Sequence, residues 1–181
     1  MIKGIIPFNF GGYMKTIIHL AFFLLLCTSS FAKEKDISLF DQHFNDYSEN
    51  LEDAIDAKKE GIFVFFHMEE CPFCQKMRRN VFTQKPIIDY FRQHFLNFEI
   101  DVESSVNLTD FDGNTLQEKI FAQRHNLVGA TPVLAFFDLN GKRVVRHTGF
   151  VNKKDFLLLA NYFVDKSYKK EPFIRYKRKH K

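Results

Sequence analysis

Cys71-Pro72-Phe73-Cys74 is the stretch that decides how this chain folds. A hydrophobic run leads into it, and a basic, helix-favouring run over residues 75–79 leads out of it. Two cysteines separated by two residues, where a strand pattern gives way to a helix pattern, are typical of a redox pair. One turn of chain brings both sulfurs within bonding distance, and the N–H groups at a helix start stabilise a thiolate on the first cysteine. We therefore predict reversible dithiol–disulfide chemistry here.

Three other interpretations of the cysteine pair stay open: half of a zinc site, an inert structural disulfide and a chance spacing. Zinc needs four ligands, and the histidines, which include His67, His94 and His125, show no ligand spacing. Haem attachment is excluded because Gln75 stands where that motif requires histidine. We expect no metal and no organic cofactor beyond the redox-active disulfide itself.

A segment near the amino terminus has the pattern of a cleaved secretory signal. A positive start at Lys15 precedes an apolar run over residues 17–27, and Ser30 and Ala32 have the spacing that signal peptidase accepts. The run is too short to cross a hydrocarbon core, which needs about 20 residues. We predict that residues 1–32 are removed by cleavage near Ala32 and that the protein is periplasmic or otherwise extracytoplasmic.

The same segment determines the cysteine count of the mature chain. Cys27 lies inside it, so one pair of the three cysteines is left. Lipid attachment at Cys27 is disfavoured because Leu26 is too large for the residue that usually precedes a lipidated cysteine. Met14 is a better candidate than Met1 for the initiating methionine. In an oxidising compartment a lone pair of this kind is oxidised by default unless something supplies electrons.

Charge divides the rest of the chain into an acidic body and a basic tail. The whole chain carries +4, and residues 166–181 hold eight Lys or Arg and one acid. We predict one domain of ordinary size over residues 33–168 and a basic, disordered tail over residues 169–181. The acidic body does not indicate a nucleic-acid-binding domain. Contact of the tail with an anionic membrane surface is an alternative, but we favour a solubilising end.

Hydrophobic periodicity predicts helices and strands in alternation. Residues 103–114 are polar and are expected to form an irregular insertion that could shape partner choice. The order gives parallel pairing in the first half, a hairpin at the end and helices on both faces. The expected elements are a helix over 40–59, a strand over 62–66, the cysteine helix to Asn80, a helix after a Thr83 cap, a strand over 95–102, a Thr115-capped helix to His125, strands over 133–137 and 143–147 joined at Asn140-Gly141, and a helix over 153–168.

Thr131-Pro132, immediately before the third predicted strand, completes a pattern with the cysteine pair and the hairpin. This order resembles the thioredoxin superfamily and, more narrowly, exported bacterial thioredoxin-like proteins of the SoxW-like or thioredoxin-related kind. The resemblance covers about residues 40–168. It implies an α/β thioredoxin fold, with a central mixed four-stranded sheet flanked by helices and an extra N-terminal helix. The shared stretches are residues 71–77, 128–132 and 136–142.

The resemblance also implies a wall for the substrate beside the cysteine pair. Pro132 is expected to be cis and to keep metal ions away from the sulfurs. The backbone of Thr131 is expected to pair with an extended segment of the substrate, which is an instance of strand addition. Pro72 and Phe73 complete the expected substrate-binding set.

The chain departs from cytoplasmic thioredoxins at two positions. Those proteins carry a buried Asp six residues before the first cysteine and a Trp immediately before it, whereas this chain has Phe65 and Glu70. The carrier of the proton of the second cysteine is therefore open. Glu69, Glu70, His67 and water are the candidates, and a solvated loop is the simpler interpretation of the two glutamates.

The activity that the resemblance implies is thiol–disulfide exchange. Cys71 is expected to be the exposed nucleophile, and Cys74, which lies deeper, is expected to resolve the mixed disulfide. We favour a reductase of exported proteins that receives electrons from a membrane donor. A disulfide oxidase or isomerase of the same fold is one alternative. A non-catalytic zinc-binding or partner-binding module is the alternative from another class.

Overall fold

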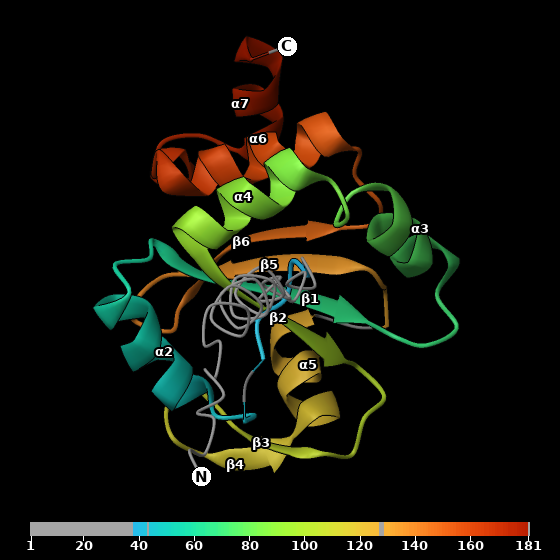
Figure 1. Ribbon diagram of the computed structural model, residues 1–181, viewed down its shortest axis with the longest axis vertical. Helices are drawn as coiled ribbons and strands as arrows, with labels where there is room; N and C mark the ends of the chain where they lie inside the picture. Colours follow the sequence, from blue (N-terminus) through green and yellow to red (C-terminus); the bar gives the residue numbers. More distant parts are fainter. Residues whose placement is uncertain (1–37, 43, 127–128, 181) are drawn as a thin grey trace, which may run out of the picture. The chain divides into compact units, whose positions relative to one another are not determined.

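The computed structural model describes residues 38–42, 44–126 and 129–180, and its centre is a mixed four-stranded sheet (Figure 1). Strand β1 pairs in parallel with β2 and antiparallel with β5, and β5 pairs antiparallel with β6. The order across the sheet is β2-β1-β5-β6. The predicted thioredoxin fold is thereby confirmed. The strands are β1 (Gly61–His67), β2 (Phe95–Asp101), β5 (Val133–Phe137) and β6 (Arg143–Thr148).

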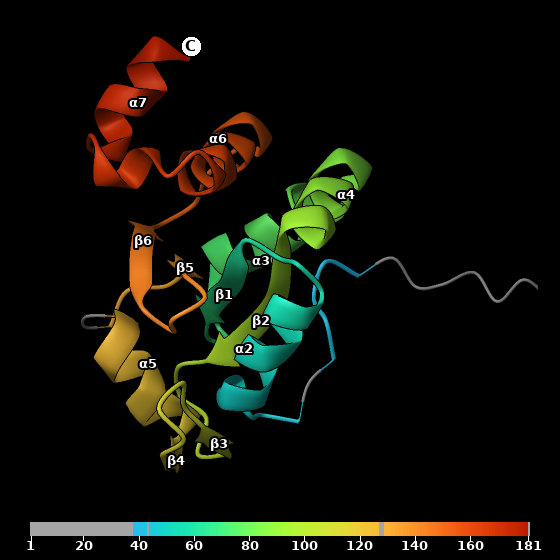
Figure 2. The ribbon, with the colours of Figure 1, turned by 90° about the vertical axis from the view of Figure 1, so that its left-hand side faces the viewer.

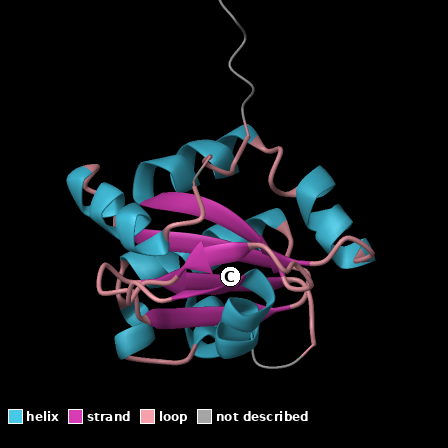
Figure 3. Cartoon of the chain, turned by 90° about the horizontal axis from the view of Figure 1, so that it is seen from below, coloured by secondary structure: helices cyan, strands magenta, loops and turns pink. Residues whose placement is uncertain are grey.

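Helices cover both faces of this sheet (Figures 1 and 3). Alternate residues of a strand point to opposite faces, so Phe63 and Phe65 of β1 belong to one core cluster, and Ile62, Val64 and Phe66 belong to the other. Coverage on both sides explains why β1 and β5 are continuously apolar. The first cluster packs under α3 (Pro72–Asn80), α4 (Lys85–His94) and α6 (Lys153–Val164), and the second packs against α2 (Tyr47–Asp56) and α5 (Glu118–Asn126).

Phenylalanine rings in edge-on and tilted contact fill the core on the α3 side of the sheet. The ring of Phe63 lies 5.1 Å from that of Phe91, 5.0 Å from Phe136 and 5.5 Å from Phe156, measured between centroids. Full burial of one such side chain contributes roughly 1.5–3 kcal/mol. The phenylalanine excess in the sequence is thus largely core packing, which fixes the platform on which α3 rests.

The extra N-terminal helix is present, but it begins at Tyr47 and not at residue 40. Asp46 is extended and its carboxylate accepts the first free N–H groups of α2, which defines the helix start. Residues 38–42 instead lie along the outer edge of β2. There the Asp41 N–H donates to the Asn97 carbonyl at 2.8 Å, and the Asn97 N–H donates to Asp41 Oδ2 at 2.9 Å. This pairing covers an open sheet edge.

The segment predicted to be an irregular insertion, residues 103–114, contributes one strand to a second, two-stranded sheet. Strand β3 (Asn107–Thr109) pairs antiparallel with β4 (Thr115–Gln117). Thr115 therefore lies in a strand, and its predicted role as a helix cap is wrong. The turn between the strands is organised by Asp110 Oδ1, which accepts the N–H groups of Asp112 and Asn114 at 3.0 and 2.8 Å.

Two other boundaries differ from the prediction. Thr83 does not cap the helix that follows it, because its hydroxyl donates to the Arg79 carbonyl at 2.9 Å and Gln84 takes the cap position. The final predicted helix, α6, ends at Val164 and is followed by a 3-10 turn, η1 (Ser167–Lys169).

The predicted disordered tail is wrong for the part of it that the structure describes. Residues Phe173–Lys179 form helix α7, which lies beyond α6 (Figure 2). Tyr176 is only 3% exposed there. Its hydroxyl donates to Asp165 Oδ2 at 2.6 Å. Apolar and hydrogen-bonding side chains hidden in a basic run therefore order this segment.

The predicted signal segment, residues 1–32 with Cys27, lies outside the described residues and stays a prediction. Within the part of the chain that the structure describes, no helix combines the length and apolar character needed to cross a membrane.

Candidate active site

Cys71 is the cap residue at the start of α3. Strand β1 ends at His67, and a short loop carries the chain from it to the helix. The Cys71 backbone is extended, with φ −112° and ψ 101°, and the Cys74 N–H points at Cys71 Sγ from 3.0 Å. Pro72 occupies the first turn, where its missing N–H removes no helical hydrogen bond. The sulfur of Cys71 thus lies where a helix start stabilises negative charge.

Cys71 and Cys74 form a disulfide, with their Cα atoms 5.1 Å apart. Cys71 is 3% exposed and Cys74 is 1% exposed. The expectation of an exposed Cys71 is therefore wrong for this oxidised form, because the cap side chain folds back over the first helical turn toward Cys74. The two residues between the cysteines, Pro72 and Phe73, are exposed, Phe73 at 57%.

The three predicted proton carriers lie in the segment before Cys71. Glu69 and Glu70 are exposed, whereas His67 is half-buried and its ring stacks on Phe65 with 5.6 Å between centroids. Burial lowers the pKa of His67 and the Arg78 guanidinium lowers it further, against an opposing effect of Glu99 and Asp101. Among the described residues, no hydrogen bond joins any of these three side chains to either cysteine.

Phe65 is fully buried at the position where cytoplasmic thioredoxins have an acid. Its ring packs edge-on against Phe82 at 4.8 Å, and the guanidinium of Arg78 lies 5.4 Å from the ring centroid. Arg78 pairs with Glu99 at 2.6 Å, and Glu99 lies opposite Phe65 in the β1–β2 register. An aromatic ring with a paired guanidinium over it thus stands where cytoplasmic thioredoxins have a buried carboxylate. We did not predict the pair, because only the parallel register brings Glu99 beside Arg78.

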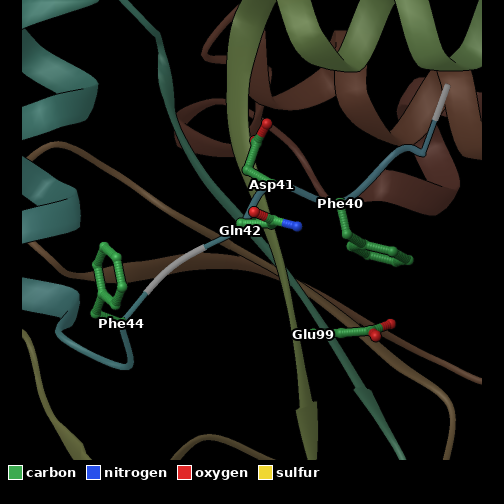
Figure 4. Close-up of a pocket in the computed structure, with 5 residues that line it drawn as sticks. All are labelled: Phe40, Asp41, Gln42, Phe44 and Glu99. Atoms are coloured by element: carbon green, nitrogen blue, oxygen red, sulfur yellow. The ribbon is translucent and has the colours of Figure 1, made fainter. Parts of the chain in front are cut away.

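A surface pocket of about 630 Å³ opens beside this ion pair (Figure 4). Its wall combines one carboxylate of β2 with the segment that covers the edge of that strand. It contains none of the predicted site residues, so the pocket is separate from the disulfide. Its lining residues are Phe40, Asp41, Gln42, Phe44 and Glu99.

The Thr131–Pro132 peptide bond is cis, as the resemblance implied. Val133 lies opposite Phe66, so this turn is at the same end of the sheet as the loop that leads to Cys71. The Pro132 carbonyl accepts the Gly149 N–H at 2.8 Å. The buried Thr131 hydroxyl has no hydrogen-bond partner among the described residues.

A cation–aromatic contact joins α3 to the segment after β6. Lys76 Nζ lies 4.6 Å from the ring centroid of Phe150, next to Gly149. Together with the bond from Gly149 to Pro132, this contact connects the helix, the cis turn and the segment after β6. The sequence offered no signal for Phe150, because the contact depends on how the hairpin returns to α3.

Comparisons with known proteins agree with the fold. Among solved structures, a thioredoxin-fold protein from Helicobacter pylori is similar at 18% identity and a TM-score of 0.55, over 68% of this chain and 88% of that one. A putative disulphide-isomerase from Bacteroides thetaiotaomicron is similar at 23% identity and a TM-score of 0.54, over 69% and 91%. A thioredoxin from Thermus thermophilus is similar at 24% identity and 0.51, over 65% and 84%.

No curated protein matches the chain. The family described as Thioredoxin-like domain matches residues 47–163, which include the cysteine pair, the cis turn and the whole four-stranded sheet. This chain belongs to the thioredoxin-like domain family.

Proposed function

We propose that the protein is an exported thiol–disulfide oxidoreductase that reduces disulfides in exported partner proteins. One observation carries the proposal: Cys71 caps α3 and is bonded to Cys74 across the first turn of that helix. The same sulfur is thus placed to be stabilised as a thiolate when reduced and to be captured by its neighbour when oxidised. Export rests on the signal pattern of residues 1–32.

The reaction balances as a two-electron exchange. In the reduced protein, the Cys71 thiolate attacks one sulfur of the partner disulfide. A bond forms between the two proteins, the partner's S–S bond breaks, and the released sulfur takes up a proton. The Cys74 thiol then loses its proton, and the resulting thiolate attacks Cys71 Sγ. The Cys71–Cys74 bond forms, and the second partner sulfur leaves and is protonated. An external dithiol donor must afterwards return two electrons to the pair.

The side chains around the pair support docking of an extended partner segment. Pro72 and Phe73 are exposed beside the buried sulfurs, and we propose that a partner first contacts them. Thr131 lies outside the strand ladders, which supports the proposal that its backbone pairs with a partner strand at the cis turn. Main-chain pairing of this kind gives affinity with little sequence preference.

Phe65 fills the position of the buried acid of cytoplasmic thioredoxins, so no acid at that position assists release of the Cys74 proton. Of the proposed carriers, His67 has a pKa lowered by burial, which keeps its ring neutral and able to accept a proton near pH 7. Glu69 and Glu70 are exposed and stay alternatives. Replacement of His67 by Gln should slow resolution of the mixed disulfide most near pH 7, where the ring is neutral and the Cys74 thiol is still protonated. The effect should be smaller in acid, where the ring is protonated, and in alkali, where the thiol ionises unaided.

Capture of partners tests the proposed function directly. Cys74→Ser, expressed in the host, should retain partners as mixed disulfides on Cys71, and mass spectrometry should identify them. Cys71→Ser is the matched control, because it keeps one cysteine in the same helix turn. Equal capture by the two variants, or no capture by either, would contradict the proposed roles.

The reduction potential tests the direction. Equilibration of the purified protein in glutathione buffers should give a value nearer the ~−270 mV of thioredoxin than the ~−120 mV of a strong oxidant. A value near the oxidant end would favour the alternative, a disulfide oxidase of the same fold. Insulin reduction by the wild type but not by Cys71→Ser would exclude an inert disulfide.

A further inference from the structure

Helix α7 lies outside the part of the chain that the family accounts for. The family match ends at residue 163, whereas α7 covers Phe173–Lys179. Figures 1 and 2 place α7 beyond α6, and both views separate it from α3. The redox chemistry therefore does not explain why this addition is ordered.

One face of α7 is fixed to the body. Tyr176 is buried, with its ring 5.2 Å from that of Tyr162, and Phe173 lies 5.4 Å from the same ring. Lys177 Nζ pairs with Asp155 of α6 at 2.6 Å. The aromatic residues of α7 thus all face inward, together with one of its cations.

The opposite face carries cations that the body does not neutralise. Ile174 is 59% exposed, and Arg175 and Arg178 are exposed beside it. At 100° per residue these three lie opposite Phe173 and Tyr176 on the helix. Lys170, just before the helix, is also exposed. In the described part of the chain, Lys170, Arg175 and Arg178 form no salt bridge.

We propose that this outer face of α7, formed by Ile174, Arg175 and Arg178, docks the protein on an anionic lipid surface, with the exposed Lys170 just before the helix as a further cation. Separate long cations around one aliphatic side chain suit a diffuse layer of phosphate headgroups, with Ile174 entering between them. Energetic centres of protein interfaces are instead enriched in Trp, Tyr and Arg seated in pockets, and the aromatic residues of α7 face the body. Because α7 and α3 are well separated, docking leaves the cysteine pair open to partners.

Sedimentation with vesicles tests this inference without any redox readout. The protein isolated from its host should bind vesicles of phosphatidylcholine with 30% phosphatidylglycerol in low salt. Binding should be lost in 0.5 M salt and should be absent on pure phosphatidylcholine. Reversal of three cations, as Lys170→Glu, Arg175→Glu and Arg178→Glu together, should weaken binding at least about 100-fold. Ile174→Ser should weaken it a few-fold at each salt concentration at which the wild type still binds.

A matched variant separates the face from the net charge. Lys58→Glu, Arg79→Glu and Lys142→Glu together change the net charge equally at exposed positions on other elements. This variant should bind within about threefold of the wild type. Equal weakening of both triple variants, or wild-type binding by the α7 variant with its helix content unchanged, would overturn the proposal. Binding to poly-glutamate but not to anionic vesicles would assign the face to an acidic protein and would also overturn it.

Discussion

Helices α2 and α3 begin in the same backbone conformation but carry different atoms at the cap. Asp46 has φ −112° and ψ 103°, and Cys71 has φ −112° and ψ 101°. In each case the cap atom accepts the N–H three residues later at 3.0 Å, from Glu49 to Asp46 Oδ1 and from Cys74 to Cys71 Sγ. A cap side chain reaches the N–H of the third residue after it. Two cysteines at the cap and three residues later are therefore also close enough to bond.

The two caps differ in how fully the anion is satisfied. Asp46 Oδ1 also accepts from the Ser48 hydroxyl at 2.6 Å and from its N–H at 3.0 Å. These bonds lower the pKa of Asp46, with the Ser48 hydroxyl the largest cause and the Glu49 N–H the next. Its charge is permanent at neutral pH, and the role of Asp46 is structural. The sulfur of Cys71 is neutral in the disulfide and can be a thiolate when reduced. The same kind of helix start therefore affects the reactivity of this residue.

Making the α3 cap like the α2 cap should have the largest effect. Cys71→Asp keeps a good cap residue but removes the nucleophile. We expect insulin reduction to fall at least about 1,000-fold, while thermal unfolding stays close to that of the reduced wild type. Residual activity above that of a Cys71→Ser, Cys74→Ser double variant would show that Cys71 is not the nucleophile.

The start of α3 should stabilise the thiolate of reduced Cys71, as the start of α2 stabilises the carboxylate of Asp46. In the Cys74→Ser variant, the rate of alkylation against pH reports the Cys71 thiolate alone. We expect its pKa at least about one unit below the roughly 8.5 of a free cysteine. A midpoint at or above that value would mean that the start of α3 does not stabilise the sulfur, and the comparison with α2 would fail.

Removal of the α2 cap should affect stability and leave the chemistry alone. Asp46→Ala should lower the free energy of unfolding by about 1 kcal/mol, measured by urea denaturation, with unchanged insulin reduction. Asp46→Asn is the control and should stay within a few tenths of a kcal/mol of the wild type near neutral pH, because it also caps. A loss of redox activity in Asp46→Ala would contradict the separation of the two roles.

The same variant gives a pH dependence. The folded-state pKa of Asp46 lies below that of the unfolded chain. Its stabilising contribution is therefore fully present above about pH 4 and is lost as the pH falls through the folded-state pKa. The difference in unfolding free energy between wild type and Asp46→Ala should shrink in that acid window, and a constant difference would mean that the carboxylate charge is not involved.

Features that depend on neighbouring residues were predictable from the sequence. The redox turn, the strand before it and the hairpin at Asn140-Gly141 each follow from a local pattern, and the structure has all three. The start of α2 differs from the prediction because the apolar spacing of Phe40 and Phe44 extends the helix pattern to residues before Asp46. A cap signal of Asp46 followed by Glu49 was available and would have given the correct start.

Features that depend on strand register or on distant segments were not predictable. The Arg78–Glu99 pair needs the parallel register of β1 and β2, and the contact of Lys76 with Phe150 needs the return of the hairpin. The net charge of residues 169–181 as a whole predicts a disordered tail, and this average hides the buried face of α7. Tyr176 orders this helix because its hydroxyl donates to Asp165 and its ring packs against Tyr162.

The smallest expected effect concerns the charges that flank the Cys71 cap. Glu69 and Glu70 are exposed in the loop before Cys71, and nearby carboxylates disfavour a thiolate. Glu69→Gln with Glu70→Gln should therefore lower the midpoint of Cys71 alkylation by a few tenths of a pH unit, and added salt should reduce the shift. Glu52→Gln with Glu103→Gln, at exposed positions elsewhere, is the charge-matched control and should leave the midpoint unchanged. An upward shift in the first variant would mean that the two carboxylates do not disfavour the Cys71 thiolate, which would contradict this electrostatic argument.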